Sequence, residues 1–562
     1  MLASGFRKKL RYHLQQMLAA AHNCRETQAA TLTRLLHLNR GSQFQHHFGL
    51  TQVHSIRAFQ RALPVAGYER AAPYVELLKQ GQTDALLGAQ NRLLMFALTS
   101  GTTSETKFIP ITRQFVRDYR RGWQVWGIRA FDAHPTLHES EIFQLTSPWN
   151  LFHSPGGVPC GHISGLVQRM QNPVLRCMFA VPTAASLISD SFEKLYFGLK
   201  HGLCYPRLGM ISTANPSTLC QMFHILQEQA ETLVRDLFQG TDSAGNQTSL
   251  PVRWRRVKNV VRARALDRIL QSTGRLSPRE IWPELSLISV WTAGSAAAYL
   301  PLLREQIGEI PIRDHGLHAS EGRMTIPLED ESAEGLLDIG THFFEFIPEN
   351  EMGSPDPHVL LAHELVEDET YYIVLTTSSG MYRYDIHDVV QCTGFLGTTP
   401  LLRFLHKGSH ISNLTGEKLT ESQVVQAVTT VARRLNLQLD YFTMIPQWGN
   451  PPRYLLLVDE CRLPRIPCDL PIAEQIEVEL LHTNLEYHEK RRTMRLGPVG
   501  LLSMPSHEWQ QFINNRQAHP GSSVEQYKHP FLIPKLDFLE QLQERNPLSV
   551  VPKSDPPSPT TR

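Results

Sequence analysis

Apolar residues recur at intervals of three and four between residues 6 and 38, among Gln, Arg and His. This spacing predicts one or two helices whose apolar face covers a core. Between residues 93 and 404 the pattern changes to short apolar runs, such as 285–290 and 371–375, separated by helical stretches such as 298–307. Strands that alternate with helices in this way predict an α/β layered domain.

The apolar pattern breaks at residues 406–420, where glycine, serine, asparagine and lysine follow one another closely. Beyond the break we expect a strand at 454–458, a helix at 471–487 with proline in its first turn, and a strand at 500–504. This mixture predicts a smaller α+β domain. The expected parts are a large N-terminal domain of residues 1–405, a hinge at 406–420, a C-terminal lid domain at 421–545 and a disordered tail, rich in Pro, Ser and Thr, at 546–562.

Composition narrows the class of partner. The formal net charge is +1 with 19% charged residues, so no global field favours nucleic acid or an anionic membrane. The uncharged stretch 285–303 approaches the length of a membrane span, but Ser, Thr, Gly and Pro interrupt it. Eight scattered cysteines form no Cys-x-x-Cys pair, which argues against a zinc ribbon and a disulfide framework. We expect a cytoplasmic protein that acts on small molecules.

The strongest local motif is Thr-Ser-Gly-Thr-Thr-Ser-Glu-Thr-Lys at residues 99–107, directly after the apolar run 93–98. Hydroxyl groups, backbone N–H groups freed by glycine, and one lysine are suited to a polyphosphate. A surface turn rich in serine and threonine has the same hydroxyl groups, and Lys107 with the preceding strand favours the phosphate loop. No Gly-Lys-Ser/Thr opens a helix here, so the stretch is not a Walker P-loop.

Two further clusters carry carboxylates. Small residues surround Glu321 in the stretch 315–322, so its carboxylate has room to approach a ligand or a phosphate-bound Mg²⁺. In the stretch 380–390, Asp388 precedes the apolar pair Val389-Val390 and is placed to accept the two ribose hydroxyls of a nucleotide. A turn residue at a strand end is the alternative for Asp388.

The conjunction of these motifs, in this order, resembles the Gretchen Hagen (auxin-responsive-promoter) family of acyl-acid amido synthetases, a branch of the adenylate-forming enzymes. The resemblance extends from roughly residue 30 to residue 535 and includes the stretches 281–283, 344–348, 416–421 and 526–530. It implies a mobile lid, a small carboxylic acid and an amine as substrates, and ATP with Mg²⁺ as cofactors.

The resemblance also implies the roles of individual residues. Lys418 would lie in the hinge and Lys528 on the lid, each able to reach phosphate or acyl oxygens. The expected nucleotide contacts are Ser100, Gly101, Thr102, Thr103, Ala319, Ser320, Glu321, Arg383, Asp388, Lys418 and Lys528, and the expected catalytic residues are Lys107, Glu321, Lys418 and Lys528, with no metal held by protein ligands alone.

The chain departs from the family pattern at four positions. His387 stands where the family has glycine, Leu317 where it has an aromatic residue, and Ser104 and Thr106 where it has glycine and proline. Losing the aromatic ring would weaken adenine stacking without removing a charge. We interpret the changes as those of a divergent member, with a catalytically inactive member as the alternative.

Attack of a carboxylate on a phosphate brings two anions together, so lysines and Mg²⁺ are expected to neutralise charge. His318 and His387 adjoin the motifs and are candidate bases for the amine. His153, Cys160 and His162 lack a fourth ligand at zinc-site spacing, which favours an acyl-pocket loop over a metal site. A thioester-forming ligase and a non-catalytic ligand-binding relative remain alternatives. The acid, the amine and the oligomeric state are left open.

Overall fold

The structure is a computed structural model. It describes residues 4–100, 106–171, 176–188, 190–243, 250, 252–352, 354, 356–408, 411–412, 414–415, 417–449, 451–462, 472–492, 494–517 and 529–545. The tail expected at 546–562 lies outside these residues. No helix in the described part of the chain is long and apolar enough to cross a membrane.

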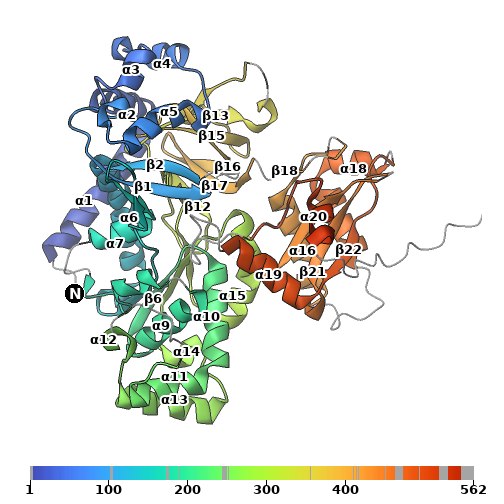
Figure 1. Ribbon diagram of the computed structural model, residues 1–562. Coiled ribbons are helices and arrows are strands. Elements are labelled where there is room, and N and C mark those ends of the chain that lie inside the picture. Colours follow the sequence, from blue (N-terminus) through green and yellow to red (C-terminus); the bar gives the residue numbers. More distant parts are fainter. Residues whose placement is uncertain are drawn as a thin grey trace, which may run out of the picture. The chain divides into compact units, whose positions relative to one another are not determined.

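The contacts divide the chain into two compact units (Figure 1). The first comprises the described residues up to Ala293 together with Leu303–Leu405. The second comprises Gly294–Leu302 and the described residues from His406 onward. The chain therefore passes from the first unit into the second at Gly294 and returns to the first at Leu303. Within the second unit, Tyr299 packs on Tyr441 and Phe531.

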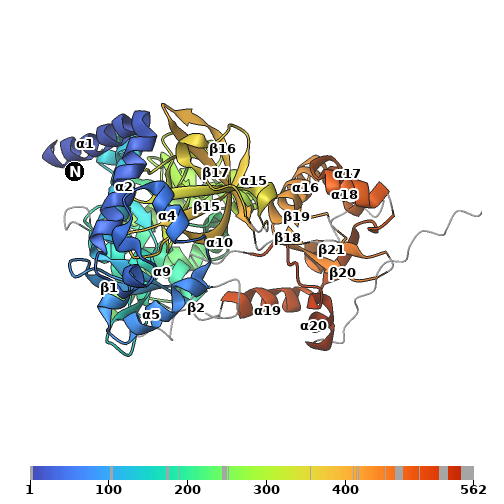
Figure 2. The same cartoon turned by 90° about the horizontal axis from the view of Figure 1, so that it is seen from above.

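Helices open the first unit, as the spacing of apolar residues predicts. Leu10 and Leu14 of the first helix are buried with Val125 and Trp126 of α6, so this helix covers α6. The second helix is visible along the same unit in Figure 2. The helices are α1 (Ser4–Ala20), α2 (Cys24–Leu38), α3 (Gln43–His47), α4 (Ile56–Ala62), α5 (Ala72–Lys79), α6 (Arg113–Ala133) and α7 (Ile163–Arg169).

A parallel sheet forms the α/β part of this unit, in the order β3-β6-β7-β8, with α9 and α10 beside it in Figure 1. Its strands are fully or nearly buried runs, which is typical of parallel strands covered by helices. The bounds are β3 (Glu141–Gln144), β6 (Leu208–Ser212), β7 (Leu287–Val290), β8 (Ile312–Asp314), α9 (Ser191–Leu203), α10 (Pro216–Glu228), α11 (Ala230–Gln239), α12 (Val252–Arg255), α13 (Val260–Thr273), α14 (Pro278–Ile281) and α15 (Leu300–Ile307).

Two further sheets and a small hairpin complete the first unit. A four-stranded sheet has the order β2-β1-β5-β4, and a seven-stranded sheet has the order β11-β12-β17-β16-β15-β13-β14. Their bounds are β1 (Leu93–Ser100), β2 (Thr106–Thr112), β4 (Phe152–His153), β5 (Pro159–Gly161), β9 (His318–Ala319), β10 (Gly322–Arg323), β11 (Thr325–Ile326), β12 (Glu334–Leu337), β13 (Phe343–Pro348), β14 (Leu360–Leu361), β15 (Thr370–Thr376), β16 (Tyr384–Leu396) and β17 (Thr399–Lys407).

The second unit is an α+β domain around the sheet β20-β21-β22. Helices α19 and α20 lie against one face, and α16, α17 and α18 lie at the other (Figure 2). Because strand residues alternate, Leu455 and Leu457 face α19 and α20 while Tyr454 meets Tyr487 of α18. The bounds are β18 (Ile411–Ser412), β19 (Leu419–Thr420), α16 (Glu421–Arg434), β20 (Phe442–Gln447), β21 (Arg453–Asp459), α17 (Ile472–Thr483), α18 (Leu485–Arg492), β22 (Gly500–Met504), α19 (Ser506–Gln517) and α20 (Phe538–Arg545).

The single helix expected at 471–487 is wrong, because two helices meet at Asn484. The side-chain oxygen of Asn484 accepts the backbone N–H of Tyr487 at 2.8 Å, which caps the start of α18. Its amide nitrogen donates to the backbone oxygen of Glu417 at 3.0 Å. This long-range contact holds Asn484 at the end of α17. The spacing of apolar residues does not predict a break at this position.

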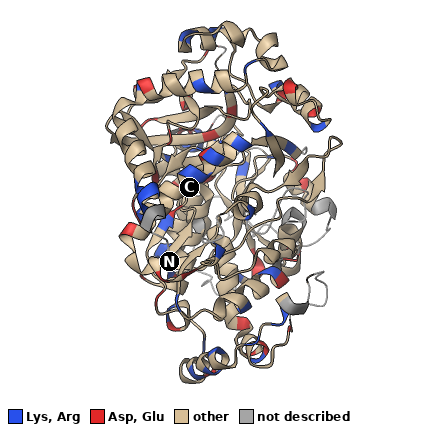
Figure 3. Ribbon diagram, turned by 90° about the vertical axis from the view of Figure 1, so that its left-hand side faces the viewer, with Lys and Arg blue, Asp and Glu red and all other residues tan. Residues whose placement is uncertain are grey.

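Charged residues of both signs are interspersed along the elements, as Figure 3 shows, in keeping with the net charge of +1. A few charged groups lie inside. Asp118 on α6 is buried, Gln114 Nε2 donates to its Oδ1 at 3.1 Å, and no described group bonds to its Oδ2. Burial raises the pKa of this carboxyl to about 6, although Arg34 and Arg121 oppose the rise.

Asp118 should make the protein less stable as the pH rises. Its pKa in the folded state exceeds the unfolded value of about 3.9, so ionisation costs folding free energy between about pH 4 and pH 6, and the full cost persists above pH 6. We expect Asp118→Asn to raise the free energy of unfolding at pH 7.5 by about 1 to 3 kcal/mol and to flatten its pH dependence. Urea unfolding at several pH values measures both.

Asp267 on α13 provides the control, since its carboxylate is bonded to Gln271 at an exposed position. Asp267→Asn should leave the pH dependence of the free energy of unfolding as it is in the wild type. A pH dependence in Asp118→Asn that matches the wild type would contradict the buried, ionisable Asp118.

Candidate functional site

The phosphate-loop motif lies between two strands that form a hairpin. β1 and β2 pair antiparallel from Leu93 opposite Thr112 to Ser100 opposite Thr106. The loop therefore leaves and re-enters the sheet at adjacent points. Gly101, Thr102 and Thr103 lie outside the described residues, as does Ser104, and Ser100 is described by its backbone alone.

Lys107 follows the loop on β2, opposite Thr99. Its Nζ lies 5.7 Å from the centre of the Tyr68 ring, within the range in which a cation is attracted to an aromatic face. The Tyr68 hydroxyl donates to the backbone oxygen of Phe108 and accepts the backbone N–H of the same residue, both at 3.1 Å. Burial raises the pKa of Tyr68 to about 12, so the ring beside Lys107 stays neutral.

Glu321 occupies a two-residue turn. β9 and β10 pair with Ala319 opposite Gly322, which leaves Ser320 and Glu321 at the tip of the hairpin. Glu321 and Ser320 are half-buried. The second motif is thus presented by a hairpin and not by a helix end, with Ala319 and Gly322 paired on either side of the turn.

The chain before this hairpin is fixed by Asp314 at the end of β8. Its carboxylate accepts the backbone N–H of Thr292 at 2.5 Å, the Thr292 hydroxyl at 2.7 Å and the backbone N–H of Gly316 at 2.5 Å. Gly316 has φ 79°, and a Cβ there would lie 2.4 Å from the backbone oxygen of Thr325. Glycine is therefore required at this position for both its conformation and its size.

Asp388 lies within β16 and not at the start of a strand. Opposite the single residue Ile373 of β15, β16 has the three residues 386–388, so the strand bulges at Asp388. Asp388 is 5% exposed. The strand in fact begins at Tyr384, which corrects the expectation that Asp388 precedes the strand formed by Val389 and Val390.

His387, which replaces the family glycine, has φ 59°. This left-handed conformation explains why glycine suits the position, since a side chain adds strain there. The backbone N–H of His387 donates to Asp385 Oδ1 at 2.7 Å, and its Nδ1 lies 2.9 Å from Asp385 Oδ2. A histidine is thus tolerated in the bulge because both its backbone N–H and its ring contact the carboxylate of Asp385.

Tyr384 lies in the electrostatic field of acidic residues from two motifs. Burial raises its pKa well above the ordinary value, and the negative charges of Glu321, Asp388 and Asp385 raise it further, with a contribution from Tyr68. Glu321 also raises the pKa of Tyr68. Glu321 and Asp388 therefore lie near enough to Tyr384 to act on its hydroxyl, and Lys107 lies beside Tyr68.

Arg383 is held inside the first unit. Its Nε lies 2.9 Å from Glu345 Oε2, and its Nη1 donates to the backbone oxygens of Leu63 at 2.6 Å and Gln60 at 3.0 Å. It is 3% exposed. These contacts give Arg383 a role in attaching the end of α4 to β13, and its expected contact with a nucleotide stays a prediction.

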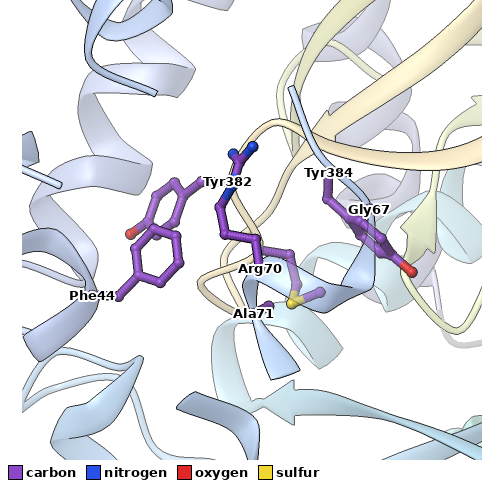
Figure 4. Close-up of a pocket in the computed structure, with 7 residues that line it drawn as sticks. Phe44, Gly67, Arg70, Ala71, Tyr382 and Tyr384 are labelled. Atoms are coloured by element: carbon purple, nitrogen blue, oxygen red, sulfur yellow. The ribbon is translucent and has the colours of Figure 1, made fainter. Parts of the chain in front are cut away.

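A small cavity adjoins the other side of Tyr384 (Figure 4). It has a volume of about 190 Å³ including the solvent at its mouth. Phe44 stacks on Tyr382 at 5.4 Å and forms one wall. Its lining is Phe44, Gly67, Arg70, Ala71, Met381, Tyr382 and Tyr384.

Lys418 belongs to the second unit, where it is exposed and has φ 45°. The preceding Glu417 is fully buried and accepts the backbone N–H of Leu414 at 2.7 Å, the backbone N–H of Thr415 at 2.8 Å and the hydroxyl of Tyr454. This network fixes the backbone from which Lys418 projects. Lys528 and Gly416 lie outside the described residues.

Sequence reasoning missed Tyr68 and Tyr384. Tyr384 lies inside the stretch 380–390, yet its role depends on burial between strands, which the spacing does not reveal. Tyr68 lies on a short 3₁₀ turn, Tyr68–Arg70, and is brought to the site because Ala66 pairs with Tyr384. The stretch around His153 and Cys160 forms the strand pair β4 and β5.

We expect Gly316→Ala to destabilise the first unit, because the left-handed φ and the contact with the Thr325 oxygen act together. The loss should exceed about 1 kcal/mol. Gly127→Ala is the control, since Gly127 lies within α6 and a Cβ there meets nothing within 4 Å. It should stabilise by about 0.5 to 1 kcal/mol. Thermal unfolding measures both, and an equal response of the two variants would contradict the fixed turn at Gly316.

Comparison with known proteins finds acyl-acid amido synthetases among the proteins that the chain resembles. It is 22% identical to a jasmonoyl–L-amino acid synthetase from Oryza sativa subsp. japonica, over 92% of this chain and 94% of the relative. It is 22% identical to an indole-3-acetic acid-amido synthetase from Arabidopsis thaliana, over 92% of this chain and 91% of the relative. The solved structure of AtGH3.15 acyl acid amido synthetase with 2,4-DB shares the fold, with a TM-score of 0.81, 19% identity and 97% of each chain covered.

Family models match the chain in three consecutive parts. The GH3 family N-terminal domain matches residues 13–312, the GH3 family central domain residues 335–407 and the GH3 family C-terminal domain residues 422–537. The first match alone spans more than half of the 562 residues. The fold, with its large layered domain and smaller α+β domain, agrees with that assignment. The chain belongs to the GH3 (Gretchen Hagen) family.

Proposed function

We propose that this protein uses ATP to activate a carboxylic acid as an acyl-adenylate and then transfers the acyl group to an amine, most simply that of an amino acid. The observation that carries the proposal is that Lys107 lies beside the half-buried Tyr68 and that Glu321 and Asp388 act on the buried Tyr384. The relatives named as amido synthetases support the same reaction class.

In the first step, a carboxylate oxygen of the acid attacks the α-phosphorus of ATP, and the bond to the β-phosphate oxygen breaks to release pyrophosphate. Both partners are anions, so the step needs positive charge at the site. Lys107 supplies one such charge on β2. At an effective dielectric constant near 20, an ammonium about 4 Å from an anionic oxygen contributes roughly 4 kcal/mol before desolvation.

The carboxylates have separate tasks in this proposal. Asp388 is buried in the bulge of β16, where a carboxylate can accept the hydroxyls of a ribose. Glu321 is half-buried at the hairpin tip, and one carboxylate with phosphate oxygens is a ligand set suited to Mg²⁺. When bound, Mg²⁺ would neutralise phosphate charge. Ser100 ends β1, and Ala319 and Ser320 directly precede Glu321 in the β9–β10 hairpin.

In the second step, a neutral amine attacks the carbonyl carbon of the anhydride, AMP leaves and the amine loses a proton. Of the two candidate bases, His387 is favoured because Asp385 holds its Nδ1 at 2.9 Å, an arrangement that orients an imidazole. His318 Nδ1 lies 2.9 Å from the Gly316 oxygen and 3.3 Å from the indole nitrogen of Trp291.

Lys418 would act from the hinge and Lys528 from the lid, and the two half-reactions would use different lid positions. The positive φ of Lys418 beside the anchored Glu417 supports residues 406–420 as the hinge. We also propose a reducing compartment such as the cytoplasm, in keeping with seven described cysteines that form no disulfide.

A thioester-forming ligase would share the first step and differ in the acceptor. Formation of product from coenzyme A, in place of amines, would favour it. A non-catalytic relative would bind acid and nucleotide without pyrophosphate exchange. The retention of Lys107, Glu321 and Asp388 around one point favours an enzyme over such a relative.

Lys107→Ala should slow adenylation by about two to three decades, because it removes positive charge from the transition state. The measurement is pyrophosphate exchange into ATP across a panel of carboxylic acids. Lys258→Ala, at an exposed lysine of the first unit, is the matched control and should retain full activity. Full exchange activity in Lys107→Ala would place the phosphate site elsewhere.

Asp388→Ala should act on ATP binding, because ribose hydroxyls would lose their acceptor. We expect a rise in the KM for ATP that corresponds to about 1 to 3 kcal/mol, with a smaller change in kcat. Asp388→Asn keeps one acceptor oxygen and should lose less. An unchanged KM for ATP in both variants would exclude the ribose role.

A further inference from the structure

The segment that contains α13 carries a concentration of positive charge. Between residues 254 and 275 the chain has seven arginines and lysines and one acid, Asp267. Because the whole protein has a net charge of only +1, this segment is far more basic than the rest of the chain. Four of its arginines are exposed: Arg256, Arg264, Arg268 and Arg275.

The charges on α13 are not neutralised by their own contacts. Ala263 and Leu266 are buried, whereas Arg264 and Arg268, four residues apart, lie on the outer side of the helix. Like charges at this spacing repel each other. Arg264 lies 6.0 Å from the centre of the Phe238 ring of α11, and Arg268 Nε donates to the backbone oxygen of Arg264 at 3.3 Å. Neither contact supplies a negative charge, so the helix bears the repulsion at a cost in stability.

Apolar side chains stand among these cations. Val261, three residues before Arg264 on the same helix, is 82% exposed, and Phe238 is 43% exposed. An apolar centre within a polar rim is the usual composition of a protein–protein interface. We call this surface the basic face, which comprises Phe238, Arg256, Val261, Arg264, Arg268 and Arg275.

A segment of opposite charge lies between β13 and β15. Residues 349–369 contain seven acids and no lysine or arginine. The turn directly before β15 presents three consecutive exposed acids, and Val366 beside them is 58% exposed. We call this surface the acidic turn, which comprises Val366, Glu367, Asp368 and Glu369.

The backbone of the acidic turn is fixed. Asp368 donates its backbone N–H to the Cys392 oxygen at 2.7 Å, and its own backbone oxygen accepts Gln391 Nε2 at 3.3 Å. Asp368 has φ 67°, a left-handed conformation that adds strain in a residue other than glycine. Three adjacent carboxylates held in this way repel one another. A cationic partner would relieve that repulsion, as an anionic partner would at the basic face.

The two charged surfaces lie at opposite ends of the first unit, to which both belong. Figure 1 shows α13 at the lower end of this unit, and β13 and β15, the strands on either side of the acidic segment, near its upper end. The basic face and the acidic turn therefore do not meet within one folded unit. A second copy of the chain supplies the complementary charge to each.

We propose that the protein associates with itself head to tail, with the basic face of one copy on the acidic turn of the next. Val261 and Phe238 would meet Val366 at the centre of the contact. Because the interface joins two different surfaces, each assembly keeps one unused surface at either end and can add further copies. The small net charge favours association, since the copies carry little overall like charge. Surface ion pairs are individually weak and are screened by salt, so the association is reversible and strongest at low ionic strength.

Sedimentation velocity of the full chain at a series of concentrations tests the proposal. In about 50 mM NaCl the weight-average mass of the wild type should rise with concentration, and in about 300 mM NaCl the association constant should fall by about tenfold or more. Arg264→Glu with Arg268→Glu reverses the basic face, and Glu367→Lys with Glu369→Lys reverses the acidic turn. Each double variant should stay monomeric, because its two surfaces then carry the same sign of charge.

Recombining the variants distinguishes head-to-tail pairing from other modes of association. An equal mixture of the two double variants, and a single chain with all four substitutions, bring opposite charges together again, so both should associate as the wild type does. Arg113→Glu with Arg117→Glu is the matched control. These exposed arginines are also four residues apart, on α6, and their reversal changes the net charge equally. This control should associate as the wild type does.

Thermal unfolding shows whether each variant is folded, and the melting temperature should change little because the substituted side chains are exposed. If Arg264→Glu is unstable without its contact to Phe238, Arg268→Glu with Arg275→Glu reverses the basic face instead and should also stay monomeric. A wild type that is monomeric at low salt, an association that salt does not weaken, or a mixture that stays monomeric would overturn the proposal. A monomeric wild type that binds single-stranded RNA through the basic face would overturn it as well, and would assign that face to another partner.

Discussion

The candidate site depends on the hydrogen bonds that the buried carboxylate of Asp314 accepts. Asp314 ends the last strand of the parallel sheet and holds the backbone after β7, through Thr292, and the turn at Gly316. Burial raises its pKa to about 6 although these donors oppose the rise, so the carboxylate is kept at a cost in solvation. These hydrogen bonds fix the turn that leads into the β9–β10 hairpin, which carries both Glu321 and Arg323.

Acidic residues predominate among the charged groups that act on Tyr384. Three carboxylates, those of Glu321, Asp388 and Asp385, influence one neutral tyrosine, and Lys107 stands on the neighbouring hairpin. Carboxylates of like charge repel one another in a partly buried site, and a bound cation relieves that repulsion. In the proposed function, a nucleotide that carries Mg²⁺ would relieve this repulsion.

Residues of one motif differ in what they contact within the fold. Arg383 and Asp388 are five residues apart in one motif, yet Arg383 is bonded to Glu345 and to the end of α4, whereas Asp388 lies in a bulge beside Tyr384. His387 shows a third kind of position, where the backbone conformation favours glycine and a bonded carboxylate accommodates a histidine. A sequence motif lists Arg383, His387 and Asp388 without distinguishing these three roles.

The sequence by itself determined the local and ordered features: the helices within residues 6–38, the strand before the expected phosphate loop, the strands β21 and β22, and the family motifs around Glu321 and Asp388. These depend on periodicity and on residue types at short range. Only the tertiary structure decided the partnership of Tyr68 with Tyr384, the break at Asn484 and the burial of Arg323, whose Nε and Nη1 have no hydrogen-bond acceptor among the described residues. Each of these arises where segments distant in the chain pack together, and burial of that kind leaves no periodic signal in the residues themselves.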